Sequence, residues 1–157
     1  MERCRPAEPA DLERLVALAR ELHGELAVMR GGEIWAARDA RREPLEPGLA
    51  AQLDDPAACV LVGLIDDVVV GYAVLVLEPL VTGDVLGRIT DLFVEAPARE
   101  VGVGEALSDG LLAFAAEHDA VGVDALALPG HRATKNFFEE QGFTARALTM
   151  HRPAAHR

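Results

Sequence analysis

The stretch that decides the fold is Asp91–Leu107, with the sequence DLFVEAPAREVGVGEAL. It begins as a β-strand, because Leu92–Val94 are residues that favour extended backbone and Pro97 ends the run. Gly102 and Gly104 follow in a short loop, after which apolar residues recur at helical spacing. A strand, a glycine loop and a helix N-terminus together can hold phosphate, since free backbone N–H groups and the positive end of the helix dipole point into the loop.

The spacing of the glycines narrows the choice of phosphate-binding loop. A dinucleotide-binding loop requires a third glycine where Leu107 stands, and a P-loop requires a Gly-Lys-Ser/Thr run, which the only lysine, Lys135, does not provide. The remaining pattern, Arg99-x-x-Gly102-x-Gly104, resembles the acyl-CoA pyrophosphate loop of the GNAT superfamily of N-acetyltransferases, Q/R-x-x-G-x-G/A. The alternative is an ordinary strand-to-helix turn whose glycines serve packing.

The composition is that of an ordinary globular domain, with 157 residues of which 50% are hydrophobic and 26% charged. We expect a single domain over residues 1–157, with a short C-terminal tail at 151–157. No apolar run approaches the roughly 20 residues of a membrane span. The N-terminus has no apolar signal core, so we expect a cytoplasmic protein without a membrane partner. The net charge of −11 argues against non-specific nucleic-acid binding and leaves room for cationic partners.

The cysteines and histidines predict neither a disulfide nor a metal site. Cys4 and Cys59 have no C-x-x-C spacing, and in a reducing compartment they are expected to be buried thiols. The five histidines are scattered, with no pair at i and i+4 that could ligate a metal.

Hydrophobic periodicity and turn residues predict strand, helices, three strands, helix, strand, helix and strand in chain order. We expect strands at 2–6, 58–65, 68–77, 88–94, 121–128 and 144–150, and helices at 11–27, 33–42, 103–118 and 132–141, with a further turn at 49–53. The strand at 121–128 is almost wholly apolar and is expected to be buried on both faces. Segment 28–57 is either a mobile, substrate-facing segment or a solvated connector. This order predicts an α/β fold with a mixed, mostly antiparallel sheet and helices on both faces, which is also the order of elements in the GNAT fold.

A second segment, His131–Phe143, has the sequence HRATKNFFEEQGF and resembles the GNAT segment N-x-x-A-x-x-L-Y-x-x-x-G-F. The aromatic pair and the Gly-Phe end are in register, but two positions depart from the pattern. His131 stands where the family often has an asparagine that contacts the pantetheine or orders the helix start. Phe138 stands where the family often has a tyrosine proposed to protonate the departing thiolate, which phenylalanine cannot do. The only tyrosine of the chain, Tyr72, lies in a predicted hairpin strand.

The resemblance implies direct transfer of an acetyl group from acetyl-CoA to an amine. Amides of the glycine loop would hold the pyrophosphate, and the strand before it would pair with the pantetheine and donate an N–H to the thioester oxygen. The residues implied to bind the cofactor are Leu92, Phe93, Val94, Arg99, Glu100, Val101, Gly102, Val103, Gly104, Glu105, His131 and Phe138. The implied partners are acetyl-CoA, an amine that could be cationic and a second copy of the chain.

Two residues are candidates for proton transfer, Asp91 and His131. An alkyl amine has a pKa near 10.4 and must lose a proton before it attacks, so a base or a water chain is needed. GRITDLFV resembles the strand of polyamine-acetylating members, which carry an acidic pair where this chain has Thr90 and Asp91. Asp91 either faces the substrate amine or makes a structural hydrogen bond. His131 either acts as the acid for the leaving thiolate or orders the start of its helix.

The function indicated is N-acetyl transfer to a primary amine of a small molecule or peptide, and three alternatives stay open. The first is a non-catalytic acyl-CoA-binding or regulatory domain, since Phe138 replaces the tyrosine. The second is a protein acetyltransferase that uses the acidic surface to dock a basic segment. The third, a serine hydrolase built on Ser108, is disfavoured because this serine lies inside a predicted helix rather than directly after a strand.

Overall fold

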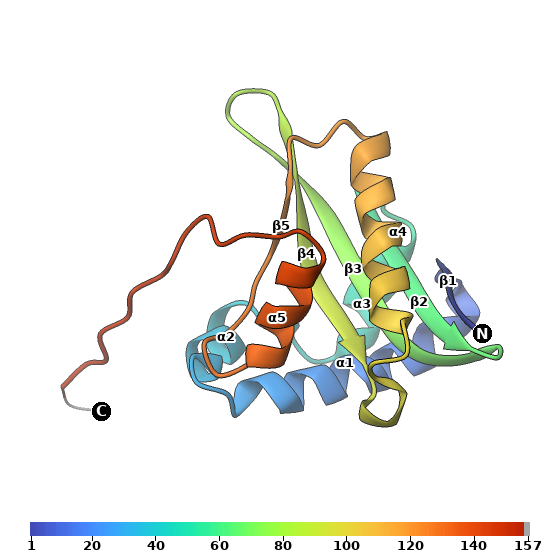
Figure 1. Ribbon diagram of the computed structural model, residues 1–157, viewed down its shortest axis with the longest axis horizontal. Coiled ribbons are helices and arrows are strands. Elements are labelled where there is room, and N and C mark those ends of the chain that lie inside the picture. Colours follow the sequence, from blue (N-terminus) through green and yellow to red (C-terminus); the bar gives the residue numbers. More distant parts are fainter. Residues whose placement is uncertain (156–157) are drawn as a thin grey trace.

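The computed structural model describes residues 1–155, which form a five-stranded sheet with helices on both faces (Figure 1). The strand order is β1-β2-β3-β4-β5, antiparallel throughout except that β5 runs parallel to β4. The sequence prediction of a mixed, mostly antiparallel α/β sheet is confirmed. In chain order the elements are β1 (Glu2–Pro6), a 3₁₀ turn (Pro9–Asp11), α1 (Leu12–Ala27), α2 (Gly32–Arg38), α3 (Leu45–Leu53), β2 (Ala58–Ile65), β3 (Val68–Pro79), β4 (Val85–Val94), a 3₁₀ turn (Ala96–Ala98), α4 (Val103–Glu117), β5 (Val123–Ala125) and α5 (Arg132–Glu140).

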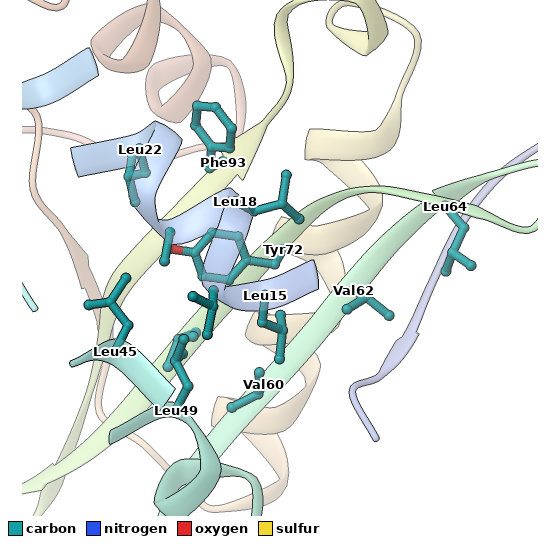
Figure 2. Close-up of a cluster of buried hydrophobic side chains, with 13 residues drawn as sticks. Leu15, Leu18, Leu22, Leu45, Leu49, Val60, Val62, Leu64, Tyr72 and Phe93 are labelled. Carbon is teal, nitrogen blue, oxygen red and sulfur yellow. The ribbon is translucent and has the colours of Figure 1, made fainter. Parts of the chain in front are cut away.

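One face of the sheet is covered by α1 and α3. Leucines of these two helices pack on alternate residues of the central strands, and the hydroxyl of Tyr72 lies inside the same cluster (Figure 2). The labelled members of the cluster are Leu15, Leu18, Leu22, Leu45, Leu49, Val60, Val62, Leu64, Tyr72 and Phe93. Because side chains alternate along a strand, the neighbouring residues of β2, β3 and β4 point to the other face.

The second face is covered by α4, with α5 packed beside it. Leu107 and Leu111 of α4 and Phe138 of α5 contact the opposite set of strand residues, which includes Val94. Both faces of β2 and β3 are therefore buried, which explains why these strands read as continuous apolar runs. As the alternation predicts, Leu92 and Val94 face this helix-covered core whereas Phe93 faces α1.

Two turns follow the predicted chemistry. Asp66 and Asp67 join β2 and β3 with φ angles of 47° and 69°, the left-handed pair of a tight hairpin turn. Gly142 ends α5 with a φ of 90°, as expected of a left-handed helix cap. Cys4 and Cys59 are free, half-buried thiols, and burial raises the pKa of Cys59 to about 11.

The structure corrects four expectations about the elements. Helix α2 ends at Arg38 rather than at residue 42, and α3 is a helix of nine residues rather than a single turn at 49–53. The strand expected at 121–128 is reduced to Val123–Ala125, and its residues are half-buried rather than buried on both faces. The strand expected at 144–150 is absent, although those residues are described. Strand β5 is as short as its pairing with Gly87–Ile89 of β4, and residues 144–150 pair with no strand of residues 1–155.

Candidate functional site

The sheet opens along one edge of β4. Pairing with β5 covers only Gly87–Ile89, so the rest of β4 has no strand on that side within the described residues. On this side the Val94 carbonyl accepts a hydrogen bond from Arg99 Nε at 2.6 Å. Backbone groups alternate in direction along an antiparallel strand. Leu92 and Val94 therefore turn their N–H and C=O groups to the open edge, whereas Phe93 pairs with β3.

A cleft of about 700 Å³ lies along this open edge. Strand β4, the loop before α4, the first turn of α4 and the length of α5 line it, and α1 and α2 border one end. The cleft brings together most residues that the sequence singled out: Asp91, Leu92, Phe93, Val94, Arg99, Glu100, Gly102, Gly104, Glu105, His131 and Phe138. The side chains of Val101 and Val103 lie elsewhere, the first in solvent and the second in the core under α4.

The N-terminus of α4 presents free amides to the cleft. Ala106 is the first residue whose N–H enters the helical ladder, bonding to the Gly102 carbonyl at 3.0 Å. Gly102 is the N-cap residue with a φ of 99°, and no side chain of the described residues caps this end. The N–H groups of residues 103–105 are thus left for a ligand, with the helix dipole behind them.

The second glycine of the loop serves packing. A Cβ at Gly104 would lie 3.3 Å from Cε1 of Phe137, so glycine lets α5 approach the start of α4. Gly102 therefore supplies the left-handed backbone conformation at the start of α4, and Gly104 supplies the space for the contact with α5.

One carboxylate, Glu25 of α1, links three elements across the cleft. Its two oxygens accept from Nη1 and Nη2 of Arg99 at 3.0 Å each, and Oε1 lies 3.8 Å from Nε2 of His131. The other ring nitrogen of His131, Nδ1, contacts Thr134 Oγ1 in the first turn of α5. Sequence reasoning missed Glu25, because α1 carries several acidic residues and only the tertiary fold shows which of them enters the cleft.

Asp91 lies at the inner end of the cleft and is 5% exposed. Its carboxylate accepts four hydrogen bonds: from Arg41 Nε at 2.8 Å and Nη2 at 2.9 Å, from the Tyr72 hydroxyl at 2.5 Å, and from Thr90 Oγ1 at 2.7 Å. Burial raises the pKa of Tyr72 well above its usual value, and the Asp91 charge raises it further. Burial acts to lower the pKa of Arg41, but its pairing with Asp91 outweighs burial and raises it. All lone pairs of the carboxylate are occupied in this arrangement.

A second, smaller cavity of about 110 Å³ adjoins Asp91 on the side of α1 and α2. The rings of His23 and Trp35 form part of its lining with a centroid separation of 5.5 Å, together with Arg41. Trp35 and Asp91 border both cavities. Segment 28–57 therefore contributes to the lining of both cavities.

Phe138 has an apolar setting. Its ring is buried and makes edge contacts with Phe137 and Phe143, at centroid separations of 5.4 and 5.1 Å. Tyr72, whose hydroxyl donates to Asp91, is fully buried on the α1 face of the sheet. Ser108 lies within α4, fully buried, where it cannot serve as an exposed nucleophile.

The described residues contain no group of three or more His, Cys, Asp or Glu side chains placed to hold a metal ion. No helix among residues 1–155 is both long and apolar enough to cross a membrane.

Comparison with known families gives one match that covers most of the chain. The model of the acetyltransferase (GNAT) family matches residues 16–143. No curated protein sequence gives a significant match.

Solved structures with the same fold are numerous, although their sequences are distant. An acetyltransferase from Trypanosoma brucei has a TM-score of 0.70 at 21% identity, covering 98% of this chain and 100% of that one. The ribosomal-protein-alanine N-acetyltransferase of Brucella melitensis has a TM-score of 0.70 at 18% identity, covering 99% and 100%. AAC(6')-Iy, in complex with the bisubstrate analogue CoA-S-monomethyl-acetylneamine, has a TM-score of 0.76 at 14% identity, covering 99% of each chain. At these identities the likeness shows the fold alone.

Proposed function

Because the chain belongs to the GNAT acetyltransferase family, we propose that it transfers an acetyl group from acetyl-CoA to a primary amine of a small molecule or peptide. The observation that carries this proposal is that two sets of unpaired backbone groups line the same cleft. The open edge of β4 and the uncapped N-terminus of α4 both face the same space of about 700 Å³.

The cofactor would lie along this cleft in an extended form. The amides of residues 103–105 and the α4 dipole would hold the pyrophosphate, since a helix N-terminus favours bound anions. The pantetheine arm would pair with Leu92 and Val94 as an additional strand does. Each terminal nitrogen of Arg99 donates one hydrogen bond to Glu25 and keeps a second N–H, which could be donated to the phosphates.

The reaction requires an unprotonated amine to attack the thioester carbonyl and a thiolate to leave. A backbone N–H at the open edge of β4 would stabilise the developing oxyanion, which commonly contributes several kcal/mol. A thiol with a pKa of about 8.5 is a fair leaving group without a strong acid. Phe138 cannot supply a proton, so water or His131 would protonate the departing sulfur.

Three side chains are candidates for accepting the amine proton, namely Asp91, His131 and Glu25. Asp91 is the candidate from the sequence, but its four hydrogen bonds leave no free lone pair. Each oxygen of Glu25 accepts one hydrogen bond from Arg99 and keeps a second lone pair. We therefore propose that Glu25, beside His131, takes the proton, and that Asp91 holds Arg41 and Tyr72 in place.

A specific observation favours a second candidate function, an acyl-CoA-binding domain without catalysis. The buried ring of Phe138 stands at the sequence position of the expected tyrosine, and the hydroxyl of the only tyrosine, Tyr72, donates a hydrogen bond to Asp91 instead. Loss of one general acid commonly lowers a rate about 10²- to 10⁴-fold, so binding could persist where turnover is slow.

The experiment that separates the two functions measures CoA release from acetyl-CoA in the presence of a panel of amines and peptides. The panel includes diamines, amino sugars and peptides with a free N-terminal alanine or an internal lysine. Release above the rate of spontaneous hydrolysis, with an acetylated product identified by mass spectrometry, is the expected result. Tight binding of acetyl-CoA without product formation for any acceptor would favour the non-catalytic domain.

A further inference from the structure

The end of the cleft that α1 and α2 border is apolar. Its walls come from the last turns of α1, from α2 and from the residues after β5, which lie far apart in the sequence. The loop before α2 packs on the residues after β5, because a Cβ at Gly31 would lie 3.3 Å from Cδ of Pro129. Figure 1 shows α2 beside the segment that joins β5 to α5. The apolar side chains that line this end are Leu22, Leu26, Trp35, Leu126 and Leu128.

Two of these side chains have surface left for a ligand to cover. Leu126 is 59% exposed although it lines the cleft. Trp35, the only tryptophan of the chain, is half-buried, and its ring lies 5.5 Å from that of His23 between centroids. A ring held in this way is a rigid surface on which a second ring can pack edge-on or offset. Covering both side chains removes apolar surface from water, which favours a ligand with an apolar body.

Glu25 places one negative charge beside this apolar end. Residues three or four apart on a helix share a face, so Glu25 and Leu26 of α1 both lie on the side of Leu22. Each oxygen of Glu25 keeps a lone pair next to the hydrogen bond that it accepts from Arg99. An amine can therefore contact Glu25 while its substituent contacts the apolar side chains.

The neighbouring strand does not provide a second free charge. Thr90 is uncharged, and the carboxylate of Asp91 is filled by four hydrogen bonds, two of them from the guanidinium of Arg41. The charge of Asp91 is thus balanced within the protein. A second ammonium group on a short diamine would find no free carboxylate on β4.

The other carboxylates that border the cleft belong to other parts of it. Glu100 and Glu105 lie in the loop and first turn of α4, the side that the pyrophosphate takes under the proposed function. Glu140 is the last residue of α5, whereas His131, beside Glu25, precedes the first, so the length of this helix separates Glu140 from Glu25. The apolar end of the cleft is therefore suited to one positive charge rather than to several.

Resting on the proposed function, we propose that the acceptor is a primary amine with a single positive charge, joined by a short alkyl arm to an aromatic ring. The ring packs against Trp35 and Leu126, and the amine lies at Glu25. In the transfer the amine nitrogen bonds to the acetyl carbon and gives a proton to Glu25. The C–S bond of the thioester breaks, its electron pair leaves on the sulfur of CoA, and the sulfur takes a proton from water.

Trp35 makes the binding step measurable without turnover. Because the chain has one tryptophan, the change in its fluorescence on titration reports a ligand at this end of the cleft. Phenethylamine represents the proposed class, putrescine is a short diamine, and phenethyl alcohol has the ring without the charge. The same compounds are titrated with CoA present, and the two amines are then assayed for acetyl transfer with acetyl-CoA.

Variants of the two side chains test the contact with the ring. Trp35→Ala removes the aromatic surface, and Leu126→Ser changes an exposed side chain that the fold does not need. Ile34→Ala is the matched control, because Ile34 precedes Trp35 in α2, is 46% exposed and does not line the cleft. Trp35→Phe is the conservative variant, since it keeps a ring at the same position.

We expect kcat/KM for phenethylamine to exceed that for putrescine by at least about tenfold, since putrescine leaves the apolar surface uncovered. Trp35→Ala should raise KM for phenethylamine by about tenfold through loss of the ring contact, and Leu126→Ser should raise it by a smaller factor. Trp35→Phe should restore most of the loss. Ile34→Ala should behave as the unchanged protein, and all four variants should keep their affinity for acetyl-CoA.

The outcomes separate this assignment from the proposed function. A saturable fluorescence change with phenethylamine, weaker with the other two compounds, supports the assignment even where no amine is acetylated, and in that case only the proposed function fails. Acetylation of putrescine with an equal or higher kcat/KM would overturn the assignment and leave the proposed function intact. Unchanged kinetics with phenethylamine in both Trp35→Ala and Leu126→Ser would overturn the assignment as well. Neither binding nor transfer with any amine would overturn both.

Discussion

Asp91 can keep a negative charge inside the molecule only because donors surround it. A buried charge costs several kcal/mol unless it is paired and hydrogen-bonded. Arg41 pairs with the charge of Asp91, and Arg41, Tyr72 and Thr90 together donate four hydrogen bonds to its carboxylate. Of the two roles that the sequence allowed for Asp91, the contacts favour the structural one, and its role as a base stays a prediction.

Removing the charge of Asp91 should destabilise the fold. We expect Asp91→Asn to lower the free energy of unfolding by about 3–5 kcal/mol, because it leaves the guanidinium of Arg41 buried without a counter-ion. The double variant Asp91→Asn/Arg41→Met should regain part of that loss. Urea unfolding of the unchanged protein, the two single variants and the double variant would measure this double-mutant cycle. Unchanged stability, with a raised KM and a lowered kcat for amines alone, would identify Asp91 as the base.

Replacements of Glu25 and His131 should differ in their effect on the pH–rate profile. We expect Glu25→Gln to remove the acid limb, because the base that accepts the amine proton is lost. His131→Ala should lower the rate modestly and keep the shape of the profile, since its contact with Thr134 favours a role in ordering the start of α5. The matched control is Glu21→Gln, at an exposed position of the same helix. Loss of the alkaline limb in His131→Ala would instead make this residue the acid.

At the scale of residues, the sequence predicted the part of the site that is local in the chain. The strand, loop and helix start at 91–105 reach the cleft together because they follow one another. Glu25, Trp35 and Arg41 were not found, because their contacts join segments that are 50 or more residues apart or depend on where α1 and α2 end. No periodicity or spacing carries such information.

Among the elements, the structure follows the predicted order but departs at its C-terminal end. The apolar run at 121–128 and the segment 144–150 after the cap at Gly142 suggested two full strands, yet only Val123–Ala125 pairs. Intrinsic preference for extended backbone is not sufficient, because a strand is stabilised by its neighbours. The length of α3 was underestimated because its amphipathic pattern is weak. Tertiary packing stabilises this helix instead, since Leu45 and Leu49 are buried against α1.

The contact between α4 and β2 depends on a missing side chain at Gly63. A Cβ there would lie 2.5 Å from Cγ1 of Val103, a stiff and buried side chain. We expect Gly63→Ala to lower the free energy of unfolding by about 1–3 kcal/mol through overpacking.

Gly24 provides the matched control for this variant. It lies inside α1 with no atom within 4 Å of an added Cβ. Gly24→Ala should raise the free energy of unfolding by about 0.5–1 kcal/mol, because alanine loses less backbone entropy in a helix. Urea unfolding of both variants checks the pair, and a loss of stability in Gly24→Ala or none in Gly63→Ala would contradict the packing described here.

The whole molecule is acidic, and so is its cleft. Five carboxylates border the cleft and only Arg99 and His131 oppose them. This charge attracts cationic amines, but it repels an anionic cofactor. Under the proposed function, retention of acetyl-CoA would come from local backbone donors rather than from the net charge of −11. The carboxylates in question are those of Glu25, Asp91, Glu100, Glu105 and Glu140.

Calorimetric titration with acetyl-CoA shows whether the loop at the start of α4 holds the pyrophosphate of acetyl-CoA, as we propose. Gly102 and Gly83 both have left-handed φ angles, 99° and 92°, but Gly83 lies in the turn between β3 and β4, outside the cleft. Valine at either position imposes similar backbone strain. We predict that the unchanged protein binds acetyl-CoA, that Gly102→Val weakens binding by at least about tenfold, equal to ~1.4 kcal/mol, and that Gly83→Val binds as the unchanged protein does. Absence of binding to the unchanged protein, or equal affinity in a folded Gly102→Val variant, would contradict the account.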